Sequence, residues 1–123
     1  MVAWFEIPVT NMERAITFYE KVFAIKLERH EMGELDMAWF PYHQEGATTI
    51  SGSLVKHDAF YTPSDKGVVI YFASQEGDLA VELGRIEDAG GTIVQKKTLI
   101  SEEVGYMAVF MDTEGNRIAL YNK

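Results

Sequence analysis

Glu6 is the residue best placed to do chemistry, because it is the one charged side chain in an otherwise apolar stretch, Ala3 to Val9. Trp4 lies two residues before it, and side chains two positions apart lie on the same face of a β-strand. A carboxylate held against an indole and away from water becomes more basic, which suits a general base. The alternative is that Glu6 faces solvent at a sheet edge. The sequence names no acid or oxyanion donor that would complete such a catalytic group.

The histidines and the absence of cysteine restrict the other possible chemistry. His30, His43 and His57 fall at expected strand ends or in an expected connector, without the i,i+4 spacing that places two ligands on one helix face. We therefore do not expect them to share a metal site. A chain with no cysteine forms no disulfide, thiolate metal site or thiol nucleophile. We expect no bound cofactor.

A strand and the helix after it must position Glu6. Residues 3–9 are rich in β-prone side chains and predict a strand, and Thr10 or Asn11 can cap the following helix. In residues 12–23 the apolar side chains recur at helical spacing, which predicts one buried and one exposed face. The apolar positions are Met12, Ala15, Ile16, Tyr19, Val22 and Phe23.

The same order of elements returns in the second half of the chain. In the first half, the strands expected after the helix cover residues 24–29, 35–42 and 48–55. In the second half, the expected strands cover residues 67–73, 92–96, 106–111 and 116–121. A helix expected over residues 78–89 is capped by Ser74, Glu76 or Asp78 and ended by Gly90 and Gly91. A Glu-Gly pair precedes the last strand of each half, at residues 45–46 and 114–115.

This duplication predicts an α+β fold of two tandem βαβββ modules in a single domain, residues 1–123. Module one covers about 2–56, the connector about 57–66 and module two about 67–122, with Trp4 matching Val68 about 64 residues later. Two curved antiparallel sheets, with the helices on their convex backs, would then enclose a cleft.

Composition limits the partners. The 123 residues are 47% hydrophobic, which is ample for a packed core. A formal net charge of −8, with scattered Lys and Arg, argues against nucleic acid as a partner. No apolar run approaches the roughly 18 residues that a membrane-spanning helix requires, so we expect no membrane partner and a cytoplasmic protein. Exposed sheet edges favour a homodimer.

Three segments together, FEIPVTNMERAITFYEKVF, AGGTIV and MDTEGNRIALY, resemble the vicinal-oxygen-chelate superfamily, and within it the small glyoxalase/bleomycin-resistance-like proteins. The resemblance covers residues 3–121. It implies a divalent metal held by His, Gln or Glu side chains on four strands, at the positions of Trp4, Ser51, Val68 and Ala119. None of the four offers an imidazole, amide or carboxylate, and a lone hydroxyl is a poor ligand. We therefore expect no metal, and none of the family chemistry that depends on a Lewis acid.

Strand alternation indicates which side chains would line the cleft instead. Trp4 and Glu6 would share one face of the first strand, and Val68, Ile70 and Phe72 the matching face of the fifth. Arg117, Ala119 and Tyr121 would share that of the last strand. The expected ligand-binding residues are Trp4, Glu6, Trp39, Ser51, Val68, Ile70, Tyr106, Arg117 and Ala119.

Several of these residues have a structural alternative. Trp4 and Trp39 could be core or dimer-contact residues, Tyr106 a rim residue, and Arg117 the partner of Glu114 or Asp112. The preferred interpretation is a metal-free protein that binds a small apolar or aromatic molecule. The alternatives are a lyase or isomerase that uses Glu6 as base or a non-standard metal site, and an interaction domain whose cleft is filled by its own side chains.

Overall fold

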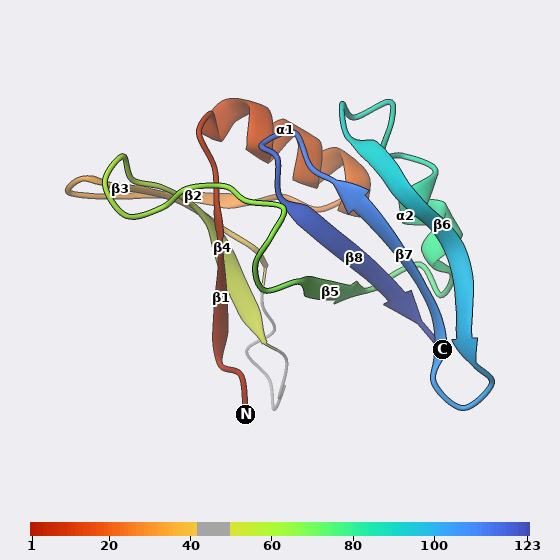
Figure 1. The fold of residues 1–123 in the computed structure, drawn as a ribbon. Helices are drawn as coiled ribbons and strands as arrows, with labels where there is room; N and C mark the ends of the chain where they lie inside the picture. Colours follow the sequence, from red (N-terminus) through yellow and green to blue (C-terminus); the bar gives the residue numbers. More distant parts are fainter. Residues whose placement is uncertain (42–49) are drawn as a thin grey trace.

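The computed structural model of the chain describes residues 1–41 and 50–123, and it contains two βαβββ modules joined by a connector (Figure 1). In module one the elements are β1 (Trp4–Pro8), α1 (Met12–Phe23), β2 (Glu28–Met32), β3 (Leu35–Trp39) and β4 (Ser51–Lys56). In module two they are β5 (Ile70–Ala73), α2 (Leu79–Leu83), β6 (Thr92–Ser101), β7 (Gly105–Met111) and β8 (Arg117–Asn122). The predicted α+β class with two such modules is confirmed. The expected turn at His43 to Ala47 and the first Glu-Gly pair lie outside the described residues.

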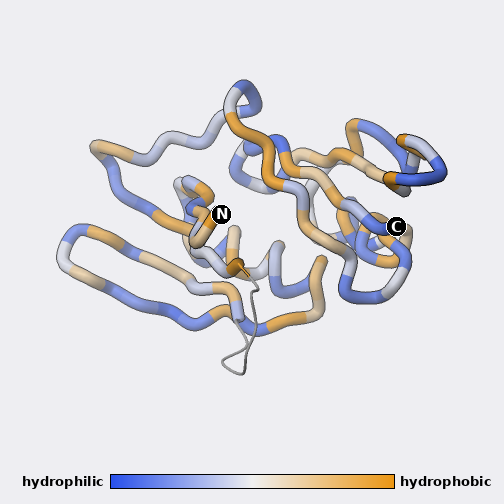
Figure 2. The backbone as a smooth tube through the Cα atoms, turned by 90° about the horizontal axis from the view of Figure 1, so that it is seen from below, coloured by the Kyte–Doolittle hydropathy of each residue, from blue (hydrophilic) through white to orange (hydrophobic). Residues whose placement is uncertain are grey.

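Each module forms one four-stranded sheet, in the orders β1-β4-β3-β2 and β5-β8-β7-β6. The expectation of purely antiparallel pairing is wrong, because β1 pairs with β4, and β5 with β8, in parallel. The reason is the crossover helix. It brings the chain back in the direction of the first strand, and two hairpins then reverse that direction twice. The last strand of each module therefore runs alongside the first. Figure 2 shows hydrophilic and hydrophobic stretches interspersed along the chain.

Helix α1 begins and ends at the residues predicted from the sequence, Met12 and Phe23. Of the two candidate caps, Asn11 is the one used, and its Oδ1 accepts a hydrogen bond from the backbone N–H of Arg14 at 3.1 Å. The helix ends at Ala24, which adopts a left-handed conformation with φ 54°. Glu20 then accepts a hydrogen bond from the backbone N–H of Leu27 at 2.9 Å. The residues from Ala24, which were expected to start a strand, form the capped end of α1 instead, so β2 begins at Glu28, four residues later than expected.

Helix α2 is shorter than predicted. Asp78 is its cap, and its Oδ1 accepts from the backbone N–H of Ala80 at 2.9 Å. The regular helix stops at Leu83, because Gly84 weakens it, and turns carry the chain to Gly90. Two other bounds differ from expectation. β5 starts at Ile70 rather than Gly67, and β6 extends to Ser101 because Gly105, at φ 112°, allows a tight hairpin with β7.

The helix-side faces of the two sheets contribute to one hydrophobic core. Helix α1 lies between the modules, and Phe18 packs on Phe110 of β7 with ring centroids 5.9 Å apart. The edge strands β1 and β5 meet through Phe5 and Phe72, at 5.4 Å. A buried hydrogen bond of 2.6 Å from the Tyr19 hydroxyl to Asp112 crosses the same core. The core thus fixes the two modules against each other and leaves the opposite face of each sheet out of the main cluster.

The turn between β7 and β8 joins the modules at their polar end. Its Glu114 side chain is fully buried and accepts hydrogen bonds from the backbone N–H groups of Thr10 and Asn11, each at 2.9 Å. Arg14 donates to the same carboxylate at 2.7 Å. Asn116 donates from Nδ2 to the carbonyl oxygen of Pro8 at 2.8 Å. This turn therefore holds the end of β1 and the start of α1.

Substitution Glu114→Gln should lower the free energy of unfolding at neutral pH by about 2–3 kcal/mol. Burial alone raises the pKa of Glu114, but the hydrogen bonds from Arg14, Asn11 and Thr10 outweigh it and hold the pKa at about 2, below the ordinary 4.5. A depressed folded-state pKa contributes stability that is complete above the unfolded value and is lost as the pH falls from about 4.5 toward 2. Denaturant unfolding at several pH values measures this difference.

Glu102→Gln removes an equal charge from an exposed site on the β6–β7 turn and is the matched control. The stability gap between wild type and Glu114→Gln should narrow below pH 4.5, whereas Glu102→Gln should stay close to wild type throughout. A gap that does not change with pH would contradict the assigned role of the Glu114 charge.

Gly52→Ala should destabilise the protein by about 3 kcal/mol, because β4 passes tightly against β1 at this residue. A Cβ on Gly52 would lie 2.4 Å from the carbonyl oxygen of Phe5 and 2.5 Å from its ring. Gly67→Ala is the control, since a Cβ there meets nothing within 4 Å. Urea unfolding of the two variants should show a large loss for Gly52→Ala and little change for Gly67→Ala. Equal effects would show that β1 and β4 tolerate greater separation.

Candidate functional site

The candidate site lies on the face of the first sheet opposite α1, which we call the Trp4 face. The register places Trp4 beside Ser51, and Glu6 beside Ser53, across the β1–β4 pair. Trp39 of β3 pairs with Ser53 and so shares this face. The residues that the register assigns to it are Trp4, Glu6, Pro8, Glu28, His30, Met32, Leu35, Met37, Trp39, Ser51, Ser53 and Val55. The structure thus brings together four of the expected ligand-binding residues: Trp4, Glu6, Trp39 and Ser51.

Three rings form the apolar part of the Trp4 face. Trp4 meets Trp39 in an edge-on arrangement, with centroids 5.7 Å apart and planes at 82°. His30 stacks on the same Trp39 ring at 3.8 Å. Trp4 remains 40% exposed, whereas Nε1 of Trp39 is buried without a hydrogen-bond partner among the residues described, and Nε2 of His30 is buried 3.2 Å from a carboxylate oxygen of Glu28. Trp4 is therefore the ring that a ligand can reach.

Glu6 is exposed, so of its two expected placements the structure has the one at a sheet edge and not the burial against Trp4. The reason is that β1 is an edge strand whose side chain at this position projects from the outer face. Nε1 of Trp4 donates to one carboxylate oxygen at 3.4 Å, and the hydroxyl of Tyr61 donates to the other at 2.6 Å. The hydrogen bond to Glu6 raises the pKa of Tyr61, and partial desolvation acts in the same direction. Glu6 and Tyr61 thus form a carboxylate–phenol pair beside an exposed indole.

Tyr61 was missed by the sequence analysis. It lies in the connector, where the residue pattern has no periodicity, and 55 residues separate it from Glu6. The hydroxyl of Ser51, by contrast, is already used: it donates to the carbonyl oxygen of Phe40 at 3.0 Å, in a buried position. Ser53 likewise donates to backbone carbonyl groups. The serine hydroxyls of the Trp4 face already donate to backbone carbonyl groups and are not available to donate to a ligand.

Three of the residues expected from module two do not lie on a shared cleft face. Ile70 pairs with the core residue Ile118 and packs against the core, so the predicted inward face of β5 is wrong. Tyr106 also packs against the core, with the ammonium of Lys97 4.6 Å from its ring centroid. Val68 precedes β5 and is 95% exposed. An unbroken apolar run, GVVIYFA, gave no alternation from which the face could be read.

The residue that corresponds to Trp4 in module two is Tyr71, not Val68. Tyr71 pairs with Ala119 in parallel, just as Trp4 pairs with Ser51. Tyr71 also precedes its helix cap by seven residues, as Trp4 does. The offset between the modules is therefore 67 residues at these positions, rather than 64.

This correction leaves the four expected metal-ligand positions with Trp4, Ser51, Tyr71 and Ala119. An indole and a methyl group provide no donor, the Ser51 hydroxyl is used in the sheet, and the Tyr71 phenol is a single oxygen where at least three donors are needed. Within residues 1–41 and 50–123, no group of three or more His, Cys, Asp or Glu side chains could hold a metal ion. The donors present at these positions do not fit the metal that the fold is known for.

The remaining polar candidates lie apart. Arg117 is exposed at the start of β8, and its expected pairing with Glu114 is not observed, since Arg14 occupies that carboxylate. His57 lies just after β4 and contacts Glu34 at 3.4 Å, whereas His30 lies on β2 and contacts Glu28 at 3.2 Å, so the two imidazoles have different partners. His43 lies outside the described residues.

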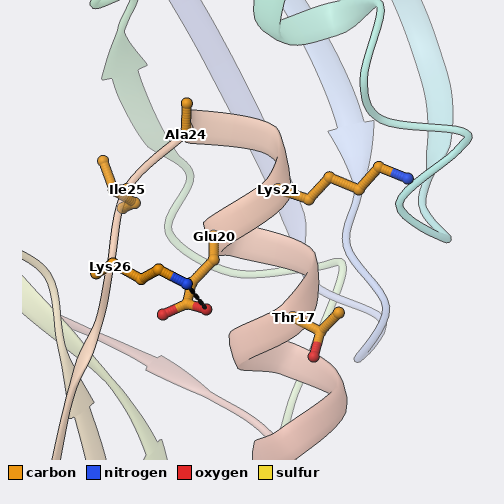
Figure 3. Close-up of a pocket in the computed structure, with 6 residues that line it drawn as sticks. All are labelled: Thr17, Glu20, Lys21, Ala24, Ile25 and Lys26. Atoms are coloured by element: carbon orange, nitrogen blue, oxygen red, sulfur yellow. Dashed lines mark ion pairs between the residues drawn. The ribbon is translucent and has the colours of Figure 1, made fainter.

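Two surface hollows lie elsewhere. A hollow of about 480 Å³ at the end of α1 is lined by Thr17, Glu20, Lys21, Ala24, Ile25 and Lys26 (Figure 3). Figure 3 shows Lys26 directed toward Glu20, at 3.8 Å, and Lys21 pointing away from them. A second hollow, of about 180 Å³, lies between the end of β1 and the connector and includes Tyr61 and His57. The first hollow is lined in half by charged side chains and offers no grouping that would select a ligand. The second hollow adjoins the Glu6–Tyr61 pair.

Comparison with known proteins identifies the class. The model of the Glyoxalase/Bleomycin resistance protein/Dioxygenase superfamily matches residues 1–120, so the chain belongs to this superfamily. No curated protein sequence matches the chain.

Solved structures share the fold at low identity. Glyoxalase I from Zea mays is 20% identical with a TM-score of 0.69, over 96% of this chain but only 44% of the maize chain. A glyoxylase/bleomycin resistance protein/dioxygenase domain from Frankia sp. EAN1pec is 17% identical with a TM-score of 0.73, over 98% and 94%. TnmS3, an antibiotic binding protein from Streptomyces sp. CB03234, is 23% identical with a TM-score of 0.64, over 98% and 93%. No helix in the described part of the chain is long and apolar enough to cross a membrane.

We predict that untagged protein, purified and analysed by mass spectrometry for Ni, Zn, Mn, Fe and Co, carries well under one metal per chain. The physical reason is that Trp4, Ser51, Tyr71 and Ala119 provide no imidazole, amide or carboxylate. Adding each metal, or EDTA, should leave the melting temperature unchanged, since a ligand that binds the folded state raises it. Stoichiometric metal, or a shift on adding EDTA, would contradict this assignment.

Proposed function

We propose that the protein binds a small apolar or aromatic molecule on the Trp4 face, without a metal, as a sequestering or sensing protein. The observation that carries the proposal is the pairing of an exposed indole, Trp4, with an exposed carboxylate, Glu6, on a rigid strand. Trp39 supports the Trp4 ring from one side. An apolar surface with few, well-placed polar groups is the usual composition of a small-molecule site.

The comparisons support this proposal by analogy. TnmS3, which shares the fold, is described as an antibiotic binding protein. The maize relative is a glyoxalase, but this chain spans less than half of it and lacks donors at the metal positions. Fold alone does not carry an activity, so the residues of the Trp4 face are the stronger argument.

The second candidate function is a metal-free lyase or isomerase, and the Glu6–Tyr61 hydrogen bond favours it. This hydrogen bond of 2.6 Å places the Tyr61 hydroxyl beside Glu6. Tyr61 would be the acid that the sequence could not name as a partner for a Glu6 base. The two functions differ in one observable. A sequestering protein returns its ligand unchanged, whereas an enzyme converts it.

We further propose that the chain pairs as a homodimer in the cytoplasm. The edge strand β6 exposes three apolar side chains, Val94, Leu99 and Ile100, and a second copy at this edge would reduce that exposure while leaving Trp4 open to a ligand. A chain without cysteine needs no oxidising compartment for its stability.

Ligand screening by the two indole N–H signals in ¹H–¹⁵N spectra tests the binding proposal, because the chain has two tryptophans. A bound ligand should shift the Trp4 signal most, with saturation, and mass spectrometry should recover it unchanged. Trp4→Ala should weaken binding at least tenfold, the loss expected when an aromatic contact of about 1.4 kcal/mol is removed.

Val68→Ala is the matched control, since Val68 was expected in the site but lies exposed before β5. It should bind as wild type does. Equal loss in Trp4→Ala and Val68→Ala, or retention in both, would place binding elsewhere. Recovery of a converted product that depends on Glu6 and Tyr61 would favour the enzyme.

A further inference from the structure

We infer that the ligand of the Trp4 face is an organic cation, a molecule with a protonated amine or quaternary ammonium group beside an apolar or aromatic part. The inference rests on the proposed function and specifies its ligand class. Three observations carry it: the charges of the face, the unneutralised state of Glu6, and the position of Trp4 and Tyr61 around it.

The Trp4 face is acidic. Its register positions include two carboxylates, Glu6 and Glu28, one histidine, His30, which lies 3.2 Å from Glu28, and no Lys or Arg. Arg29 pairs with Ala38 and Lys56 with Asp36, so both belong to the opposite face by register. Lys56 ends β4, lines the hollow that contains Tyr61, and is paired there with Asp58 at 3.1 Å. An anionic ligand would be repelled here, while a cation would be attracted, and the net charge of −8 strengthens that bias.

Glu6 differs from the paired carboxylates of the protein. Glu114 is neutralised by Arg14, Asp36 by Arg29 and Asp78 by Lys97. Glu6 receives hydrogen bonds from two neutral groups, the Trp4 indole and the Tyr61 hydroxyl, and makes no ion pair with any described residue. These bonds orient the carboxylate without cancelling its charge. A ligand cation would supply the missing opposite charge.

The groups around Glu6 suit such a cation. An ammonium group is attracted to the face of an indole or phenol ring, most strongly to tryptophan. Trp4 and Tyr61 turn their polar edges to the carboxylate, so both rings lie beside Glu6, and a cation paired with Glu6 would meet their faces from outside these two hydrogen bonds. The exposed Trp4 ring can also contact the apolar part of the ligand. One site thus combines ion pairing with ring contact.

Three probes of similar size test the inference: benzylammonium, benzyl alcohol and benzoate, titrated at low salt and followed by the two indole signals. Trp4→Phe assigns the signals. An exposed ion pair and an exposed cation–π contact together predict that benzylammonium binds about five- to tenfold more tightly than benzyl alcohol, and benzoate most weakly. Added salt should reduce the preference for benzylammonium and leave benzyl alcohol unaffected.

Glu6→Gln should bring the ratio of benzylammonium to benzyl alcohol affinity close to one, with little effect on benzyl alcohol itself. Glu31→Gln is the matched control: it removes the same charge from an exposed position of the same sheet, on the opposite face, and should keep the preference. Equal loss in both variants would show that only the overall charge matters and would overturn the role of Glu6.

The outcomes separate this inference from the proposed function. If benzyl alcohol or benzoate binds as tightly as benzylammonium, measured by titration of the Trp4 signal, the face binds small molecules but does not select cations. The inference then fails and the proposed function stands. If none of the three shifts either indole signal at millimolar concentration, both fail. Selective binding of benzylammonium that Glu6→Gln abolishes supports both.

Discussion

The buried carboxylate of Glu114 is the interaction on which the arrangement of the two modules depends. It lies in the turn between β7 and β8, yet its partners are the backbone of Thr10 and Asn11 and the side chain of Arg14, about a hundred residues away. These partners form the junction of β1 and α1. Without the carboxylate, the amide groups at this helix start would lack a hydrogen-bond partner. Without these donors, the carboxylate would be a buried and unpaired charge. The turn therefore determines where β1 ends, and with it the direction in which Trp4 and Glu6 project.

Much of the fold could be predicted from the sequence, because the strongest signals were local. The apolar stripe of α1, its cap at Asn11 and the repeat of the βαβββ order each depend on residues close together in the chain. The shared face of Trp4 and Glu6 followed from alternation in β1, where one charged residue marks the outward side. In β5 the same rule failed. Its uniformly apolar sequence suits either face, and only the pairing with β8 reveals that Tyr71, rather than Val68, is the equivalent of Trp4.

The parts of the site that sequence could not supply are those made by long-range contact. Tyr61 comes from a connector without periodicity, and its partner Glu6 lies in the first strand, so no spacing relates them. The stacking of His30 on Trp39 depends on the β2–β3 register, which starts four residues later than expected because the exit from α1 is capped by Glu20. The strand expected from the sequence ended at Arg29, so His30 lay outside it and no partner on the next strand could be assigned to it.

The location of the core explains how this chain keeps the superfamily fold without the superfamily ligands. Stability comes from the helix-side faces of both sheets, where Phe5, Phe18, Phe72 and Phe110 pack together. The metal-ligand positions lie on the opposite faces, outside that cluster, and their replacement by indole, hydroxyl, phenol and methyl groups costs the core nothing. Such a face is free to change its chemistry as long as β1 stays in register with β4. On the Trp4 face, the result is an aromatic and acidic surface in the place where other members would hold a cation of their own.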